Sequence, residues 1–184
     1  MSPSFLRRPW CRRIVAPALV LYALGLAAPG PPDAAAQRAD EYQVKAAVLV
    51  NMTKFVGWPL PPDPLVTCVV GDPQFGSVVA ALVRGEQVNG NPVQVRSLAP
   101  GEPLTDCNVV FVSEPAARAI PDIVVSGAGR AILTVGETPT FLREGGMIRL
   151  FTEGNRLRFQ IDAARAEAHG LRINAQLLSL AAPL

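Results

Sequence analysis

Two short apolar runs constrain the fold of this chain more than any other feature. The first covers residues 65–70 (LVTCVV), between a proline-rich stretch and a Gly-Asp-Pro turn, and the second covers residues 107–112 (CNVVFV). Both are about six residues long, rich in β-branched side chains and nearly without polar residues, which is typical of strands buried between two layers. We expect the two strands to be neighbours in one sheet, with the rest of the chain packed over or beside them.

The N-terminal region has the pattern of a secretory signal peptide. Four arginines between residues 7 and 13 form a basic segment, and the apolar segment 14–28 follows. That segment is too short and too interrupted by proline and glycine for a comfortable membrane span, although a retained membrane anchor is the alternative. Ala34-Ala35-Ala36 matches an A-x-A cleavage site. We therefore predict that residues 1–36 are a cleaved signal peptide and that residues 37–184 form a single exported domain.

Removal of the leader changes the charge of the protein. The full chain has 17 basic and 15 acidic residues, and the leader contains four arginines and Asp33, so the mature chain has 13 basic and 14 acidic residues. A nearly neutral chain offers no general electrostatic attraction to nucleic acid or to an anionic membrane surface. The remaining length suits one domain, which would bury roughly 70% of the surface of its unfolded chain.

The two apolar runs contain the only cysteines of the mature chain, Cys68 and Cys107. An even number of cysteines in an exported domain favours a disulfide. Closing a loop of about 40 residues would stabilise the fold by roughly 4 kcal/mol. A metal site and a redox-active thiol are the alternatives. The absence of a CxxC spacing and the presence of a single histidine, His169, disfavour both.

Periodicity and turn signals outline the rest of the mature chain. We predict a first helix over residues 40–55, a turn at 89–91, a hairpin around residues 153–155, and an alternation of strands and helices between them. The further strands are 92–97, 131–135, 147–152 and 157–161, and the further helices are 75–83, a bent helix from residue 115, 162–168 and 174–180. This order predicts an α/β fold: a mostly parallel sheet flanked by helices on both faces, with a C-terminal antiparallel hairpin and a disulfide.

Several residues have a structural and a functional interpretation. Asp72 follows a buried strand, where ligands often bind, but it is better explained as a helix cap. Lys54 and Trp58 could form a binding pair, but an aromatic residue at a helix exit more often packs in the core. His169 precedes Gly170 at a predicted helix end, where it more often caps than catalyses.

The sequence lacks the residue patterns of common active sites. No nucleophile with a base, no carboxylate pair and no metal spacing stands out, and there is neither a dinucleotide fingerprint nor a Walker loop. We therefore expect no catalytic residues, no metal and no cofactor. Six arginines in the C-terminal third suggest either solvated faces or an anion or partner site; they are Arg143, Arg149, Arg156, Arg158, Arg165 and Arg172.

The order of these segments resembles the YfiR family of periplasmic regulators, over essentially all of residues 41–180. Its opening signature is matched by residues 45–59 (KAAVLVNMTKFVGWP). The later matching blocks are residues 71–76 (GDPQFG), 107–113 (CNVVFVS), 133–135 (LTV) with Phe141, 145–148 (GGMI), 156–161 (RLRFQI) and 170–174 (GLRIN) with Leu177 and Leu178. Single blocks are weak signals, but this many in order is a strong one.

The resemblance implies a repressor without catalytic activity. Such proteins bind the periplasmic part of an inner-membrane diguanylate cyclase and keep it inactive, which lowers cyclic di-GMP. Release comes through an outer-membrane lipoprotein or a redox change, and the proteins tend to form homodimers. The family's common cysteine pair matches Cys68 and Cys107.

The resemblance also implies candidate site residues. A small-ligand pocket near the family's C-terminal segment would correspond to Arg172 and Asn174, and partner contacts would involve Arg158 and Gln160. Two departures from the family pattern matter. Gln160 stands where a glutamate is common, which weakens a charge-dependent contact there. The second cysteine pair that some members carry around the Gly-Gly-Met hairpin is absent, which argues against a redox switch at that place.

Two functions from different classes follow. The first is repression of a membrane-bound cyclase by a periplasmic partner protein. The second is a periplasmic small-ligand-binding module that serves a sensor kinase or an outer-membrane transporter, with its pocket beside Arg172.

Overall fold

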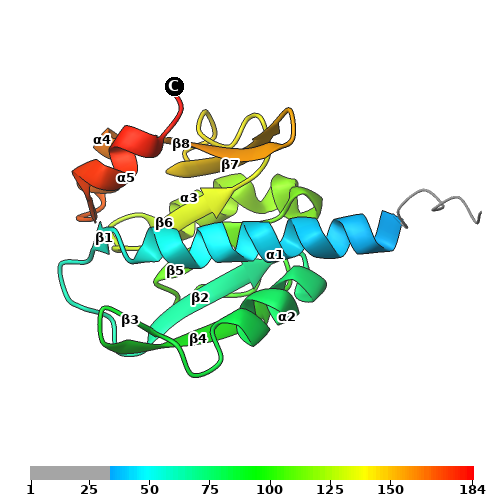
Figure 1. Ribbon diagram of the computed structural model, residues 1–184. Helices are drawn as coiled ribbons and strands as arrows, with labels where there is room; N and C mark the ends of the chain where they lie inside the picture. Colours follow the sequence, from blue (N-terminus) through cyan, green and yellow to red (C-terminus); the bar gives the residue numbers. More distant parts are fainter. Residues whose placement is uncertain (1–33) are drawn as a thin grey trace, which may run out of the picture. The chain divides into compact units, whose positions relative to one another are not determined.

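The computed structural model describes residues 34–184 and has the predicted α/β architecture (Figure 1). The elements are α1 (Ala34–Thr53), β1 (Val56–Gly57), β2 (Leu65–Val70), α2 (Pro73–Leu82), β3 (Gln87–Val88), β4 (Asn91–Leu98), β5 (Val109–Val112), the 3-10 helix η1 (Glu114–Ala119), α3 (Ile120–Gly127), β6 (Leu133–Gly136), β7 (Ile148–Glu153), β8 (Arg156–Ile161), α4 (Ala163–Ala168), β9 (Arg172–Ile173) and α5 (Ala175–Leu180).

Within these residues, seven strands form one sheet in the order β3-β4-β2-β5-β6-β7-β8. Strands β4, β2, β5, β6 and β7 are parallel, and β7 and β8 form the predicted antiparallel hairpin. The two apolar runs that carry the cysteines are indeed neighbours, because β2 pairs with β5 in the middle of the sheet. Every residue of β2, β5 and β6 is buried, as expected for strands covered on both faces.

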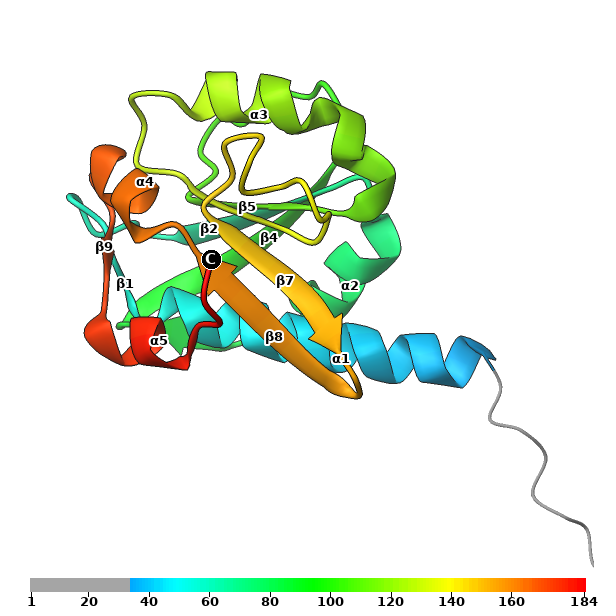
Figure 2. The same cartoon turned by 90° about the horizontal axis from the view of Figure 1, so that it is seen from above.

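Alternate residues of the central strands point to two separate cores. On one face, Leu65 and Val69 of β2 and Phe111 of β5 pack with residues of α1 and α2. On the other face, Val66 and Val70 of β2 pack with η1 and α3, together with Val110 and Val112 of β5. Figure 2 shows the sheet between these helices, with α3 on one side and α1 and α2 on the other. The predicted arrangement of helices on both faces is therefore confirmed.

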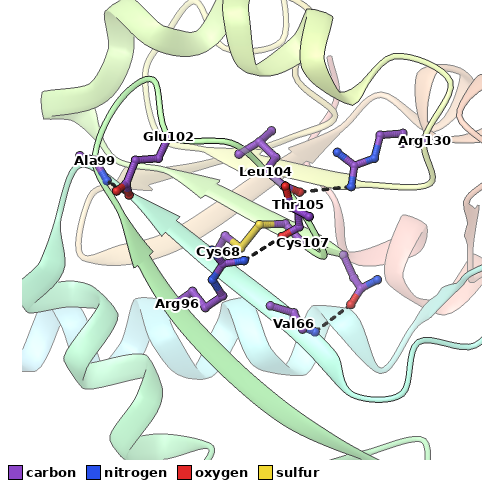
Figure 3. Close-up of a disulfide and its surroundings, with 10 residues drawn as sticks. Val66, Cys68, Arg96, Ala99, Glu102, Leu104, Thr105, Cys107 and Arg130 are labelled. Carbon is purple, nitrogen blue, oxygen red and sulfur yellow. Dashed lines mark hydrogen bonds between the residues drawn. A yellow bond between two sulfur atoms is a disulfide. The ribbon is translucent and has the colours of Figure 1, made fainter.

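The disulfide links Cys68, in the middle of β2, to Cys107, which lies two residues before the start of β5 (Figure 3). The Cα atoms of Cys68 and Cys107 are 5.8 Å apart, and the two residues are 0% and 2% exposed. Two arginines also hold the loop that leads to Cys107: Arg96 Nη1 donates to Thr105 O at 2.7 Å, and Arg130 Nη2 donates to Leu104 O at 3.2 Å. The predicted Cys68–Cys107 bond is confirmed and lies in the core rather than on the surface.

The structure adds two pairings that the sequence analysis did not predict. Strand β3 pairs antiparallel with β4 across the predicted turn at Asn89 and Gly90, so the sheet has a second antiparallel edge. Strand β1 pairs antiparallel with β9 and forms a separate two-stranded sheet. Both β1 and β3 are two residues long, and such short strands leave no readable alternation in a sequence.

The first helix begins earlier than predicted. It starts at Ala34 instead of Asp40, so the alanines of the predicted cleavage site are its first residues. The rest of the predicted signal peptide, residues 1–33, lies outside the described residues. Trp58, after the end of α1, packs against the core as expected.

Candidate functional site

The carboxyl ends of the parallel strands are where a sheet of this type usually binds ligands. The chain leaves β2 towards α2 on one face and leaves β5 towards η1 on the other, so the neighbouring strands β2 and β5 form a topological switch point. Polar residues follow each of the three central strands here: Asp72 after β2, Ser113 and Glu114 after β5, and Glu137 after β6.

Helix α1 places two side chains over this switch point. Tyr42 Oη donates a hydrogen bond to Asp72 Oδ2 at 2.5 Å, and Lys45 Nζ contacts Glu137 Oε2 at 2.5 Å. Glu137 Oε1 in turn accepts from the backbone N–H of Glu114 at 2.9 Å, and Lys45 also pairs with Glu41 at 3.3 Å. Asp72 and Glu137 are therefore bonded to the protein's own first helix.

Burial and charge in this cluster shift two pKa values. The hydrogen bond to Asp72, together with burial and the charge of Asp72, raises the pKa of Tyr42 to about 12. Burial lowers the pKa of Lys45, but the hydrogen bond and charge of Glu137 outweigh this effect, so that its pKa is raised overall. Both shifts favour the protonated side chains, which are the forms that hold α1 to the strand ends.

These shifts predict that alkaline pH weakens the docking of α1. A raised pKa in the folded state contributes stability below the unfolded-state pKa, and that stability is lost as the pH rises through the folded-state pKa. For Tyr42 the loss extends from pH 10.0 to about 12. The free energy of unfolding, measured with urea at about pH 8 and about pH 11.5, should fall less in Tyr42→Phe than in the parent protein. An equal fall in both proteins would show that the Tyr42–Asp72 bond contributes nothing to this pH dependence.

Two other predicted interpretations of polar residues are confirmed. Asp72 caps α2, because its Oδ1 atom accepts from Phe75 N at 2.8 Å. His169 is the C-terminal cap of α4, with its Nδ1 atom 3.1 Å from Arg165 O. Among residues 34–184, no three His, Cys, Asp or Glu side chains come together in a way that could hold a metal ion.

The structure brings Arg172 and Asn174 together at the end of α1. They line a cavity of about 270 Å³ with Lys54, Phe55 and neighbouring residues of β1 and β9. The Asn174 side chain also has a structural role, since its Oδ1 atom accepts from Gln176 N at 2.8 Å and caps α5. The predicted pair is therefore adjacent, and Lys54 adds a second cation to this cavity.

Arg158 and Gln160 occupy a different place, on β8. Arg158 pairs with Glu153 across the hairpin at 3.4 Å. Gln160 Oε1 accepts from Arg149 Nη1 at 3.2 Å, and Gln160 Nε2 donates to Pro183 O at 2.6 Å, so this residue connects β7 to the C-terminal segment. The cavity beside Arg172 includes neither residue, so the four predicted site residues form two separate pairs.

Arg149, one of the six C-terminal arginines, has only part of its hydrogen-bonding capacity satisfied. Its guanidinium carbon lies 4.8 Å from the centre of the Phe151 ring, and its buried Nε atom has no hydrogen-bond partner among the described residues. It lines a polar cavity of about 260 Å³ with Glu41, Glu114 and other residues beside the switch point.

Sequence reasoning missed Tyr42, Lys45 and Glu137 as members of one cluster. A signal for Glu137 was present, because it directly follows the buried strand β6, where functional polar residues are often found. Tyr42 and Lys45 carry no such signal, since they lie within a helix whose position on the sheet depends on the tertiary fold.

Comparison with known protein families gives a match over most of the described residues. A family model described as YfiR/HmsC-like covers residues 42–182, from Tyr42 in α1 to Ala182 after α5. It therefore includes every strand of the described residues, both cysteines of the disulfide and all four predicted site residues. No helix within residues 34–184 has the length and apolar character needed to cross a membrane. The resemblance noted in the sequence is confirmed, and the chain belongs to the YfiR/HmsC-like family.

Proposed function

We propose that this protein is a periplasmic regulator that binds an inner-membrane diguanylate cyclase and represses it, thereby lowering cyclic di-GMP. The observation that carries the proposal is the family match over residues 42–182, which supports a periplasmic regulator of a diguanylate cyclase at the level of the family. Export to the periplasm would follow cleavage of the predicted leader. The protein would act by binding, as a homodimer and without a cofactor, and an outer-membrane lipoprotein would release it from the cyclase.

Two structural features agree with a binding role. Ligands of such a sheet usually bind at the strand ends. Here the strand-end carboxylates Asp72 and Glu137 are bonded to Tyr42 and Lys45 of the protein's own helix α1. The Cys68–Cys107 bond suits an oxidising compartment, and both residues are almost fully buried in the core.

The test is the cellular concentration of cyclic di-GMP with the gene deleted and then restored. Deletion should raise the concentration, because a cyclase freed from its repressor becomes active, and restoration should reverse the rise. No change under several growth conditions would contradict the proposal. An equal rise in a strain that also lacks every cyclase with a periplasmic domain would contradict it as well.

A second candidate function rests on the cavity that Arg172 lines. Lys54 and Arg172 place two cations at a cavity of about 270 Å³, which suits a small anion. The protein would then be a ligand-binding module for a sensor kinase or an outer-membrane transporter. Binding of small carboxylates and phosphates, measured by calorimetry on the parent protein and on Arg172→Ala, tests this alternative. A ligand whose binding is lost in Arg172→Ala, in a protein whose deletion leaves cyclic di-GMP unchanged, would favour it.

A further inference from the structure

Two adjoining cavities form one continuous groove between α1 and the β7–β8 hairpin. The inner cavity, of about 260 Å³, and the outer cavity, of about 490 Å³, share the residues Glu41, Thr152 and Leu157. The α1 side of the groove extends from Gln37 to Lys45, and Figures 1 and 2 both show the hairpin beside this part of the helix. We call this feature the α1–hairpin groove.

The lining of the groove combines apolar side chains with a surplus of negative charge. Val44 is 53% exposed, and Leu157 from β8 lies opposite in the outer cavity. Four carboxylates line the groove, namely Asp40, Glu41, Glu114 and Glu137, against the two cations Lys45 and Arg149.

The ion pairs within the groove leave part of this negative charge uncompensated. Lys45 is shared between Glu137 and Glu41, whereas Asp40 and Glu114 form no ion pair with any residue of the described part of the chain. Arg149 lies at the inner end, with its guanidinium against Phe151 and Gln160. A ligand along the groove therefore meets exposed apolar surface beside Asp40 in the outer cavity and reaches Glu114 in the inner cavity.

The first turns of α1 are exposed and are not packed into the core of the domain. Residues 36–41 are all exposed, and burial on this helix begins at Tyr42 and Lys45. Helical turns in water are only marginally stable without an apolar face packed against something else. A second protein that packs along this part of α1 would supply that contact.

We propose that the α1–hairpin groove binds a basic, amphipathic segment of a partner protein. Apolar side chains of the segment would cover Val44 and Leu157, and its lysine or arginine side chains would face Asp40 and Glu114. The proposal deepens the proposed function and rests on it for the identity of the partner, since the segment would belong to the periplasmic part of the cyclase.

The binding test uses a model segment and two matched double variants. The probe is a short fluorescent peptide in which leucine alternates with lysine, and a leucine–glutamate peptide is the charge control. Asp40→Lys with Val44→Lys alters the groove. Asp122→Lys with Val125→Lys makes the same replacements at exposed positions of α3, on the opposite face of the sheet, where Val125 is 74% exposed. Thermal unfolding of both variants checks that the fold is retained.

We expect the parent protein to bind the lysine peptide and not the glutamate peptide. The groove variant should bind at least about tenfold more weakly, and the α3 variant should stay within about twofold of the parent. Affinity for the lysine peptide should fall as salt is added. Equal affinity of the two variants, equal affinity for the two peptides, or no binding of the lysine peptide would each overturn the proposal.

A cellular experiment separates this proposal from the proposed function. The deletion strain is restored with the parent gene, the groove variant or the α3 variant, and cyclic di-GMP is measured. Repression by the parent and the α3 variant but not by the groove variant supports both proposals. Repression by all three proteins overturns the groove while the repressor function stands, and no effect of deletion overturns the repressor function itself.

Discussion

Replacing Cys68 and Cys107 together by alanine should lower the free energy of unfolding by about 4 kcal/mol. The bond spans 39 residues of sequence, and cross-linking a loop of that size reduces the conformational entropy of the unfolded chain by this amount in the loop-closure treatment. In a domain of this size the midpoint of thermal unfolding should fall by roughly 10 °C. Urea unfolding of the double variant and of the parent protein measures the difference.

Thiol chemistry provides the control for this prediction. Cys68 and Cys107 are 0% and 2% exposed, so a reductant should reach the bond only when the protein unfolds. Titration of the exported protein in denaturant without reductant should find no free thiol. One free thiol would indicate that Cys11 of the leader is retained, and two or more would contradict the disulfide. A double variant as stable as the parent protein would show that the sheet does not depend on the bond.

Removing Glu137 should cost about 3 kcal/mol of stability. Its carboxylate pairs with Lys45 and accepts from the backbone N–H of Glu114, and the side chains of Lys45 and Glu137 are only 10% and 20% exposed. Among the described residues, Glu137→Ala leaves Lys45 with Glu41 as its one remaining ion-pair partner. Removing one member of a largely buried pair destabilises a protein far more than replacing both members by apolar residues, because a buried charge is left uncompensated. Urea unfolding measures the loss.

An exposed ion pair on the same molecule is the matched control. Glu153 and Arg158 are 66% and 42% exposed at their side chains, so Glu153→Ala should cost less than about 1 kcal/mol. The double variant Lys45→Met with Glu137→Leu should regain much of what Glu137→Ala loses, because it removes both buried charges and keeps apolar volume. Equal losses from Glu137→Ala and Glu153→Ala would show that the strand-end cluster does not hold α1 in place.

The cluster also explains why the sequence analysis located the elements better than the site. The helices and strands are set by local patterns: apolar runs for β2 and β5, a turn at Asn89 and Gly90, and a cap at Asp72. Each of these patterns lies within a few residues of the chain. The Lys45–Glu137 pair joins residues 92 positions apart, and nothing near either residue indicates the other.

The predicted site residues illustrate the same limit. Arg172 and Asn174 are neighbours in sequence, so their shared cavity needed only a local element, but the contribution of Lys54 depends on the pairing of β1 with β9. Beside a ligand pocket at Arg172 and Asn174, the family resemblance implies Arg158 and Gln160 as partner contacts. In the fold they lie on β8 and contact Glu153 and Arg149 instead.

Patterns along the chain were enough to predict the α/β class, the pairing of the two cysteine-bearing strands, their disulfide and the family. Burial on both faces forces a continuous apolar run, and such runs are visible in one dimension. The position of α1 could not be predicted in this way: the folded structure places Tyr42 and Lys45 over the strand ends and the first turns of α1 along the groove beside the β7–β8 hairpin. The physical reason is that these contacts depend on how a helix docks across a twisted sheet, which no local pattern specifies.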